Sequence, residues 1–218
     1  MMLKSQIEAQ RFLLKLVPRG YHWWLSGVEK DKAALENRRQ KYVEFYGSEL
    51  SPAKKAYRKK KGLANTHFIS VALPINIFEG GFIWFLICTD GAGPIRENIK
   101  LKDASTNPGR LVWGDYVMYE APMHRLEGGG MRWSWYLTPT VQKELDHYTG
   151  VLLKKSPDDL KDFFEMQLKR PMHHGIRHFL TRLLRRAHQN FMRMYPGRTW
   201  TARDPEVPLP ILSSYKSL

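Results

Sequence analysis

Lysine and arginine side chains gather in two stretches of the chain, at spacings that suit contact with a row of phosphate groups. The first stretch begins after Ser51 and Pro52 and is broken at Gly62; its basic residues are Lys54, Lys55, Arg58, Lys59, Lys60 and Lys61. The second lies on one face of a helix predicted from Gly175 to Tyr195; its basic residues are Arg182, Arg185, Arg186 and Arg193. Basic residues at helical spacing present a row of charge to a phosphodiester backbone. We therefore predict that both stretches contact nucleic acid, with a solvated helix face as the alternative for either one alone.

The charge of the whole chain favours a polyanionic partner. Its 218 residues include 35 Lys and Arg against 21 Asp and Glu, a formal net charge of +14 at pH 7. Nucleic acid is the commonest partner of so basic a protein, ahead of an anionic membrane surface and an acidic protein. Double-stranded DNA is the predicted ligand, with RNA as the alternative. Trp133 and Trp135 could stack on unpaired bases, but they share one face of a predicted strand and are expected to fill a core instead.

Patterns that would indicate metal binding or a cofactor are incomplete. His174 and His178 lie four residues apart on one predicted helix, but no third ligand follows at a matching spacing. Gly91 and Gly93 follow an apolar strand as in a dinucleotide-binding turn, but Arg96 stands where the third glycine is required. The sequence is therefore predicted to use no metal or cofactor and to have no enzyme active site.

A nuclease is the enzymatic alternative to a binding protein. Asp115, Glu120 and His124 are of suitable residue types, but the sequence has no tight cluster of acids that would hold catalytic magnesium. Metal-dependent cleavage of plasmid or RNA would identify such an activity directly.

Cysteine usage and hydropathy predict a cytoplasmic protein without a membrane segment. Cys88 is the only cysteine, so it cannot form a disulfide within the chain. The first 20 residues contain an apolar cluster, but charges interrupt it and no signal-peptide cleavage site follows. The longest apolar stretch, Gly80 to Thr89, is about half the roughly 20 residues that a membrane-spanning helix needs.

Helix signals dominate the two ends of the chain, and strand signals dominate the middle. The predicted helices are Gln6 to Leu16, Gly27 to about Tyr46 with Ser26 as its cap, a helix opened by Ser51 and Pro52, one from Thr138 to about Tyr148, one opened by Ser156 to Asp159, and Gly175 to Tyr195. The predicted strands are Phe68 to Leu73, Phe82 to Cys88, Leu111 to Tyr119 and Met131 to Leu137. The last two strands are predicted to form a hairpin connected through Gly128, Gly129 and Gly130.

These elements predict an α+β protein with a small central antiparallel sheet flanked by N- and C-terminal helices. The predicted regions are a basic helical region over 1–62, a β-rich region over 63–140, a helical region with the basic helix over 141–200, and an extended tail over 201–218. The tail is rich in proline and lacks a helical or strand period, so we expect it to be extended and partly wrapped on the body or disordered.

Two short segments resemble the AcaB-like transcriptional regulators of conjugative plasmids and integrating conjugative elements. They are Tyr21-His22-Trp23-Trp24-Leu25 followed by Glu29, and Ser70-Val71-Ala72-Leu73-Pro74, and the resemblance covers about a third of the chain. It implies a ribbon-helix-helix DNA binder, in which two chains pair one strand each and insert the ribbon into the major groove. Outward side chains of the strand, with Ser70 among them, would then face bases. Gly80 and Gly81 depart from the pattern because they interrupt the helix expected after the ribbon.

Charge and resemblance together predict a dimeric DNA-binding protein of a mobile genetic element that regulates conjugative transfer genes. The charge favours binding, and the resemblance alone favours regulation. The alternative is an accessory factor in DNA processing, in relaxosome assembly or replication initiation, with the hairpin from Leu111 to Leu137 acting as a wing. A footprint on a promoter would indicate the first function, and one on a transfer or replication origin the second.

Overall fold

The structure is a computed structural model that describes residues 1–73, 81–122 and 129–210. The chain forms two compact units. The first comprises Met1–Leu111 with Pro122–Trp133, and the second Val112–Ala121 with Ser134–Leu218. The predicted boundary near residue 62 therefore lies inside the first unit, whose sheet takes strands from both sides of it.

A five-stranded sheet with the order β1-β3-β4-β2-β5 forms the centre of the first unit. Its strands are β1 (Met2–Leu3), β2 (Trp23–Glu29), β3 (Thr66–Ala72), β4 (Phe82–Cys88) and β5 (Lys102–Asp103). The pair of β1 and β3 is parallel, and the other pairs are antiparallel. The helical elements of this unit are α1 (Gln6–Leu16), the 3₁₀ turn η1 (Val17–Arg19), α2 (Lys32–Tyr46), α3 (Pro52–Lys60) and α5 (Pro94–Asn98).

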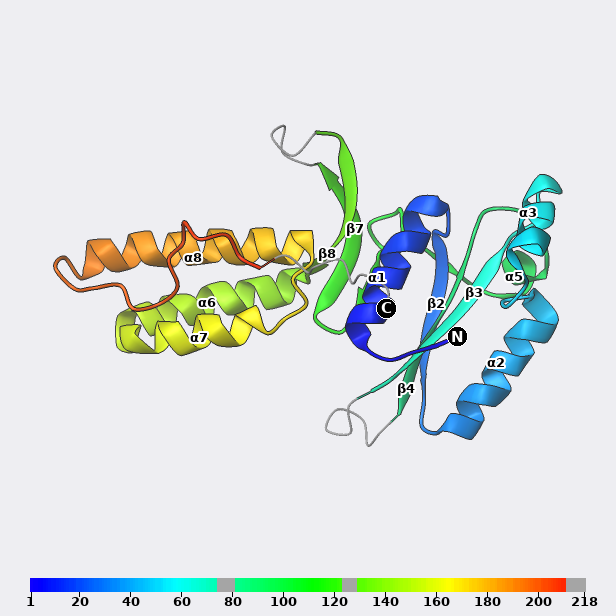
Figure 1. The fold of residues 1–218 in the computed structure, drawn as a ribbon, viewed down its shortest axis with the longest axis horizontal. Coiled ribbons are helices and arrows are strands. Elements are labelled where there is room, and N and C mark those ends of the chain that lie inside the picture. Colours follow the sequence, from blue (N-terminus) through cyan, green and yellow to red (C-terminus); the bar gives the residue numbers. More distant parts are fainter. Residues whose placement is uncertain (74–80, 123–128, 211–218) are drawn as a thin grey trace. The chain divides into compact units, whose positions relative to one another are not determined.

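Both faces of this sheet are covered, because β4 is apolar along its whole length. On one face Trp84 and Leu86 pack with Leu35 and Tyr42 of α2. On the other face lies Phe85, 1% exposed, and the same side of the sheet is covered by α1. Successive side chains of a strand point to opposite faces, so a continuous apolar run requires a cover on each side. Figure 1 shows the sheet between α1 and α2.

The second unit combines most of a three-stranded sheet with three helices. The strands, in the order β6-β7-β8, are β6 (Leu111–Trp113), β7 (Tyr116–Pro122) and β8 (Met131–Leu137). The helical elements are α6 (Pro139–Lys155), the 3₁₀ turn η3 (Pro157–Asp159), α7 (Leu160–Leu168) and α8 (His174–Met194). Gly175 places the start of α8 directly on β8, because a Cβ at this position would lie 2.3 Å from the Tyr136 ring. Its backbone N–H donates to Ser134 Oγ at 3.1 Å.

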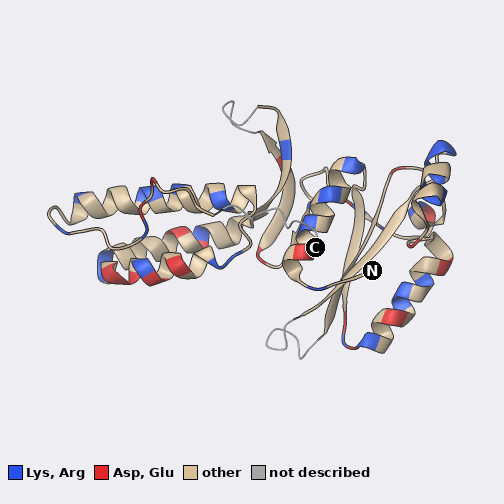
Figure 2. Cartoon of the chain, viewed as in Figure 1, with Lys and Arg blue, Asp and Glu red and all other residues tan. Residues whose placement is uncertain are grey.

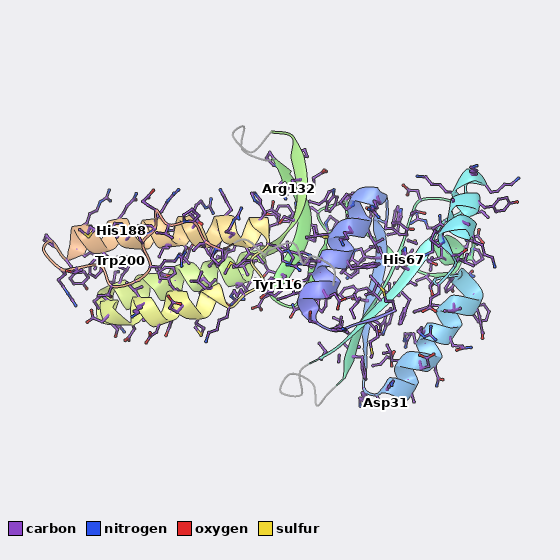
Figure 3. The ribbon with its side chains drawn as sticks, viewed as in Figure 1. Asp31, His67, Tyr116, Arg132, His188 and Trp200 are labelled. Carbon is purple, nitrogen blue, oxygen red and sulfur yellow. The ribbon has the colours of Figure 1, made fainter. Side chains whose placement is uncertain are left out.

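The segment after α8 folds back onto that helix. Trp200 meets Phe191 edge-on at 5.3 Å between ring centroids and His188 at 5.2 Å, and Figure 3 labels His188 and Trp200. Farther along, Leu209 is 4% exposed. Residues 211–218 lie outside the described part of the chain.

The α+β class is confirmed, and several predicted elements match the structure closely. Helix Gln6–Leu16 and strands Phe82–Cys88 and Met131–Leu137 have the predicted bounds. The single central sheet was wrong, because the strands divide between two sheets. Among the described helices, none is both long enough and apolar enough to cross a membrane.

The predicted helix from Gly27, capped by Ser26, was wrong at its start. Residues Trp23–Glu29 form β2, which pairs with β4 along its full length. Gly27 is required there by packing, since a Cβ would lie 2.5 Å from the Trp84 ring. The helix begins only at Lys32, where the side chain of Asp31 caps it by accepting from Ala34 N at 2.8 Å. The N-terminal region therefore contributes strands as well as helices.

Candidate nucleic-acid interface

Helix α3 forms because its ends carry strong local signals. Ser51 caps it, with Oγ accepting from Lys54 N at 3.4 Å, and Pro52 occupies the first turn, where its missing N–H costs nothing. Beyond its C-terminus, Gly62 takes a positive φ of 69°. None of the nine residues of α3 is buried. The helix therefore contributes no side chain to the apolar core.

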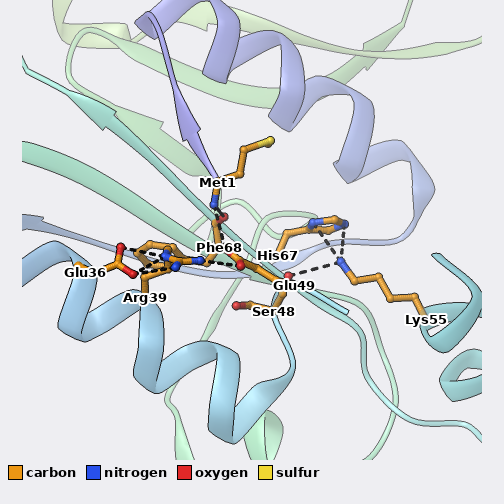
Figure 4. A network of polar contacts seen from close by, with 8 residues as sticks. All are labelled: Met1, Glu36, Arg39, Ser48, Glu49, Lys55, His67 and Phe68. Atoms are coloured by element: carbon orange, nitrogen blue, oxygen red, sulfur yellow. Dashed lines mark hydrogen bonds and ion pairs between the residues drawn. The ribbon is translucent and has the colours of Figure 1, made fainter. Parts of the chain in front are cut away.

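Polar contacts hold α3 to the first unit. Arg58 donates to the carbonyl of Ala64, at 3.2 Å from Nε and 2.7 Å from Nη2. The amide Nδ2 of Asn65 donates to the carbonyl of Lys55 at 2.9 Å. Lys55 Nζ lies 3.1 Å from Nε2 of His67, a contact that Figure 4 shows. Arg58 and Lys55, both predicted to contact phosphates, thus hold the helix in place.

Four basic residues of this segment remain for a partner. They are Lys54, Lys59, Lys60 and Lys61, all of them exposed. No ion pair involves them in the described chain, and residues 50–78 contain no Asp or Glu. Figure 2 shows the basic residues of α3 as successive blue turns. We call these four residues the α3 lysine surface; its charge is not neutralised by the surrounding described residues.

The neighbouring helix α2 shows what neutralisation looks like in the same unit. Arg39 bridges two carboxylates, with Nη2 2.7 Å from Glu36 and Nη1 2.6 Å from Glu49. Glu49 is also 3.3 Å from the amino group of Met1 (Figure 4). These carboxylate hydrogen bonds raise the pKa of Arg39 and lower the pKa of Glu49. Such a pair presents less net positive charge to solvent than unpaired lysines do.

The predicted arginine stripe of α8 is only partly open. The predicted apolar face of this helix is buried, and all four arginines lie away from it. Arg186 pairs with Asp146 of α6, and Arg185 Nε lies 3.6 Å from Glu206 in the tail. Arg182 and Arg193 are exposed and make no ion pair within the described residues. The stripe therefore offers two unpaired charges, half of what the sequence suggested.

Ser70 does not lie on a solvent-facing strand. Its side chain is only 2% exposed, and β3 pairs with β1 on one side and with β4 on the other. The element that follows β3 among the described residues is the strand β4, where a ribbon-helix-helix protein has a helix. In this single-chain structure, Ser70 therefore cannot reach a base.

A hollow of about 350 Å³ lies beside the α3 lysine surface, within the size range of ligand sites. Its lining includes Lys55 and Lys59 of α3, Arg19 and Tyr21 from the segment after α1, and Asn65. Thr89 and Asp90 complete its wall, and Asp90 Oδ1 accepts from the Trp23 indole at 2.7 Å. Lys59 therefore belongs to both features.

Burial shifts the pKa values of Lys55 and Tyr21, which line this hollow, and of His67, which contacts both. It lowers the pKa of Lys55 to about 8 against the opposing effect of Glu49. Burial and the charge of Lys55 lower the pKa of His67 to about 4. Burial also raises the pKa of Tyr21, whose ring centroid lies 5.0 Å from that of His67. At neutral pH a neutral His67 can thus accept a hydrogen bond from the Lys55 ammonium group.

Of the residues weighed for catalysis, Asp115 is engaged in an ion pair. Asp115 accepts from Arg170 at 2.9 Å, and His124 lies outside the described residues. No group of three potential metal ligands occurs in the part of the chain that the structure describes. Gly91 has a packing role, because a Cβ there would lie 2.6 Å from the backbone N of Ala64.

Sequence reasoning missed the hollow and its lining residues Arg19, Tyr21 and Asn65. No local pattern joins them, because they come together only when β3 and β4 pair and η1 returns toward α3. Searches of protein-family models, curated proteins and solved structures each found no match to this chain. Functional inference therefore depends on the charges and geometry described above.

Proposed function

We propose that this protein binds nucleic acid, with duplex DNA as the ligand and the α3 lysine surface as the main phosphate-contacting element. One observation carries the proposal: the α3 lysine surface combines four exposed lysines that make no ion pair within the described residues, and no residue of α3 is buried. A helix that contributes nothing to the core and concentrates one sign of charge is suited to an external partner of opposite charge.

The dimensions of the surface suit a nucleic-acid backbone. Lys61 lies seven positions after Lys54, which corresponds to about 10 Å along a helix at 1.5 Å per residue. That length matches the axial rise of roughly three nucleotides at 3.4 Å each along one strand of a duplex. Lysines provide point charges on flexible stems, so they contact phosphates without reading bases. The proposed contact therefore supplies affinity rather than sequence specificity.

The biological setting rests on the resemblance to AcaB-like regulators. Of its two segments, residues 23–25 and Glu29 lie in β2, and residues 70–72 lie in β3. On this basis we propose that the bound DNA is a control region of conjugative transfer genes and that the protein acts as a dimer. A footprint on an origin of transfer or replication would instead indicate an accessory DNA-processing factor.

A gel-shift comparison of duplex DNA, single-stranded DNA and RNA of equal length over a salt series tests the proposal. Affinity for the duplex should be highest, and its logarithm should fall linearly with the logarithm of salt concentration at about −0.9 per phosphate contacted. Four lysine contacts correspond to a contribution of about −3.6 to this slope. A flat salt dependence, or no binding to any of the three ligands, would contradict the proposal.

A further inference from the structure

The hollow beside α3 brings together groups that serve different parts of one small ligand. Arg19 and Lys59 are exposed cations on its rim. Tyr21 is a half-buried aromatic ring in its wall. Asn65 is 4% exposed, and its Oδ1 accepts no hydrogen bond from the described residues while its Nδ2 is engaged with Lys55. The site therefore offers charge, a flat apolar surface and a hydrogen-bond acceptor.

These three features together select among anionic ligands. Free phosphate would use the cations but not the ring, whereas a nucleotide has a phosphate, an aromatic base and N–H donors in one molecule. Stacking of a base on an aromatic side chain is tolerant of base identity. A base N–H can also supply the hydrogen bond that buried Asn65 Oδ1 lacks, and a buried acceptor without a donor is unfavourable.

We propose that this hollow binds one nucleoside monophosphate, with its phosphate on Arg19 and Lys59 and its base toward Tyr21 and Asn65. The inference rests on the proposed nucleic-acid function, which it deepens, because Lys59 belongs also to the α3 lysine surface. The monophosphate has two sources: a free nucleotide, or the phosphorylated end or an unpaired nucleotide of a strand. Asp90 also lines the hollow, and its carboxylate repels a phosphate placed beside it, which favours a phosphate position on Arg19 and Lys59.

Equilibrium dialysis with dAMP tests the site, with deoxyadenosine as the probe that lacks phosphate. Wild-type protein should bind dAMP more tightly than deoxyadenosine. Arg19→Gln and Lys59→Gln should each weaken dAMP binding about tenfold, as expected for the loss of one charge-assisted hydrogen bond. Both residues are exposed, so thermal unfolding of the two variants should match that of the wild type.

Lys54→Gln is the matched control, because Lys54 lies on the same helix and carries the same charge but does not line the hollow. It should lower duplex affinity as Lys59→Gln does, yet change dAMP affinity less than twofold. Equal effects of both variants on dAMP binding would mean general electrostatic attraction and would overturn the inference. Failure of dAMP to bind while duplex binding persists would overturn it as well and leave the proposed function intact.

A competition arm distinguishes the two sources of the ligand. A short single-stranded oligonucleotide with a 5′-phosphate should displace dAMP if the hollow receives a nucleotide of a strand. If unlabelled dAMP displaces bound labelled dAMP but the oligonucleotide does not, the result would support the site and assign it to a free nucleotide. Binding of dAMP without any duplex binding would support the hollow and contradict the proposed function.

Discussion

Helices α3 and α8 carry comparable rows of basic residues, but they differ in what lies on their other faces. Eight of the 21 residues of α8 are buried, including Ile176, Leu183 and Phe191. None of the nine residues of α3 is buried. Two arginines of α8 have carboxylate partners, whereas the α3 lysine surface has none within the described residues. A basic stripe opposite an apolar face is the ordinary solvated side of a structural helix, while a basic helix without a core face needs another explanation.

The largest expected effect is on stability. It should differ between α8, which has a buried apolar face, and α3, which has none. Leu183 is 1% exposed, so Leu183→Ala should lower the free energy of unfolding by about 2–5 kcal/mol. Tyr57 of α3 is 62% exposed, and Tyr57→Ala should change it by no more than about 0.5 kcal/mol. Urea denaturation measures both. Comparable losses in the two variants would show that α3 is also a core element.

The next largest effect is on duplex DNA affinity, and it should differ between the basic residues of α3 and those of α8. Changing Lys59, Lys60 and Lys61 together to Gln should lower duplex affinity about 100-fold near 0.1 M salt and reduce the salt slope by about 2.7, if each lysine contacts one phosphate. Changing Arg182 and Arg186 together to Gln should lower affinity less than about threefold, because Arg186 is already paired. Fluorescence anisotropy with a labelled duplex gives both values. A larger loss in the arginine variant would move the interface to α8.

The attachment of α3 through Lys55 and His67 should also make the stability of the protein depend on pH. Because the pKa of His67 is lowered to about 4 in the folded protein, protonation favours the unfolded chain, and stability is lost as pH falls from about 6.5 through 4. Unfolding at pH 7 and pH 4.5 should therefore differ less for His67→Phe than for the wild type, by about 1–3 kcal/mol. The change keeps a ring against Phe12 and Tyr21, with which His67 packs.

Unfolding measured between about pH 8 and 10.5 tests the contribution of Lys55. The lowered pKa of Lys55 means that the unfolded chain binds more protons between about pH 8 and 10.5, so this group makes stability rise with pH across that window. Lys55→Met should remove that rise. An unchanged pH profile in both His67→Phe and Lys55→Met would show that burial does not lower the pKa of either group in the folded protein.

Local signals were enough to predict much of the secondary structure, because those elements are specified by their own residues. Helix α1 and strand β4 were predicted with their full bounds, and α8 was predicted with its buried face. The error at Ser26 has a different cause. Ser26 and Gly27 resemble a helix start, but pairing with β4 and the packing of Trp84 against Gly27 make this segment a strand. Tertiary contacts overrode the local preference.

The candidate interface could be predicted in part, because a sequence shows which residues are charged but not which charges pair. The lysine run was identified, but the structural roles of Lys55 and Arg58 depend on Ala64 and His67, which only the turn after α3 brings near. Likewise, Ser70 could be placed on a strand, but the strands on both sides of it could not be foreseen. The partner of Arg186 comes from a separate helix, 40 residues earlier in the chain.

The substitution with the smallest expected effect gives the sharpest comparison, because it leaves an additional basic residue of α8 unpaired, as the lysines of α3 are. Asp146→Asn removes the carboxylate that pairs with Arg186 and raises the number of unpaired arginines on α8 without altering its apolar face. The pair is exposed, so the free energy of unfolding should change by no more than about 1 kcal/mol. If α8 is a structural helix, duplex affinity should stay within about twofold, the small gain expected from one added charge at a distance in salt.

A phosphate contact by Arg186 would produce a different result from the same substitution. In the parent, DNA would have to compete with Asp146 for the guanidinium group, so removing the carboxylate would strengthen binding more than fivefold at low salt. The salt slope would also steepen by about 0.9, the value for one additional phosphate contact. Measuring the slope as well as the affinity is therefore decisive, since a general gain in positive charge raises affinity without adding a full contact. A gain with that steeper slope would assign α8 to the interface together with α3.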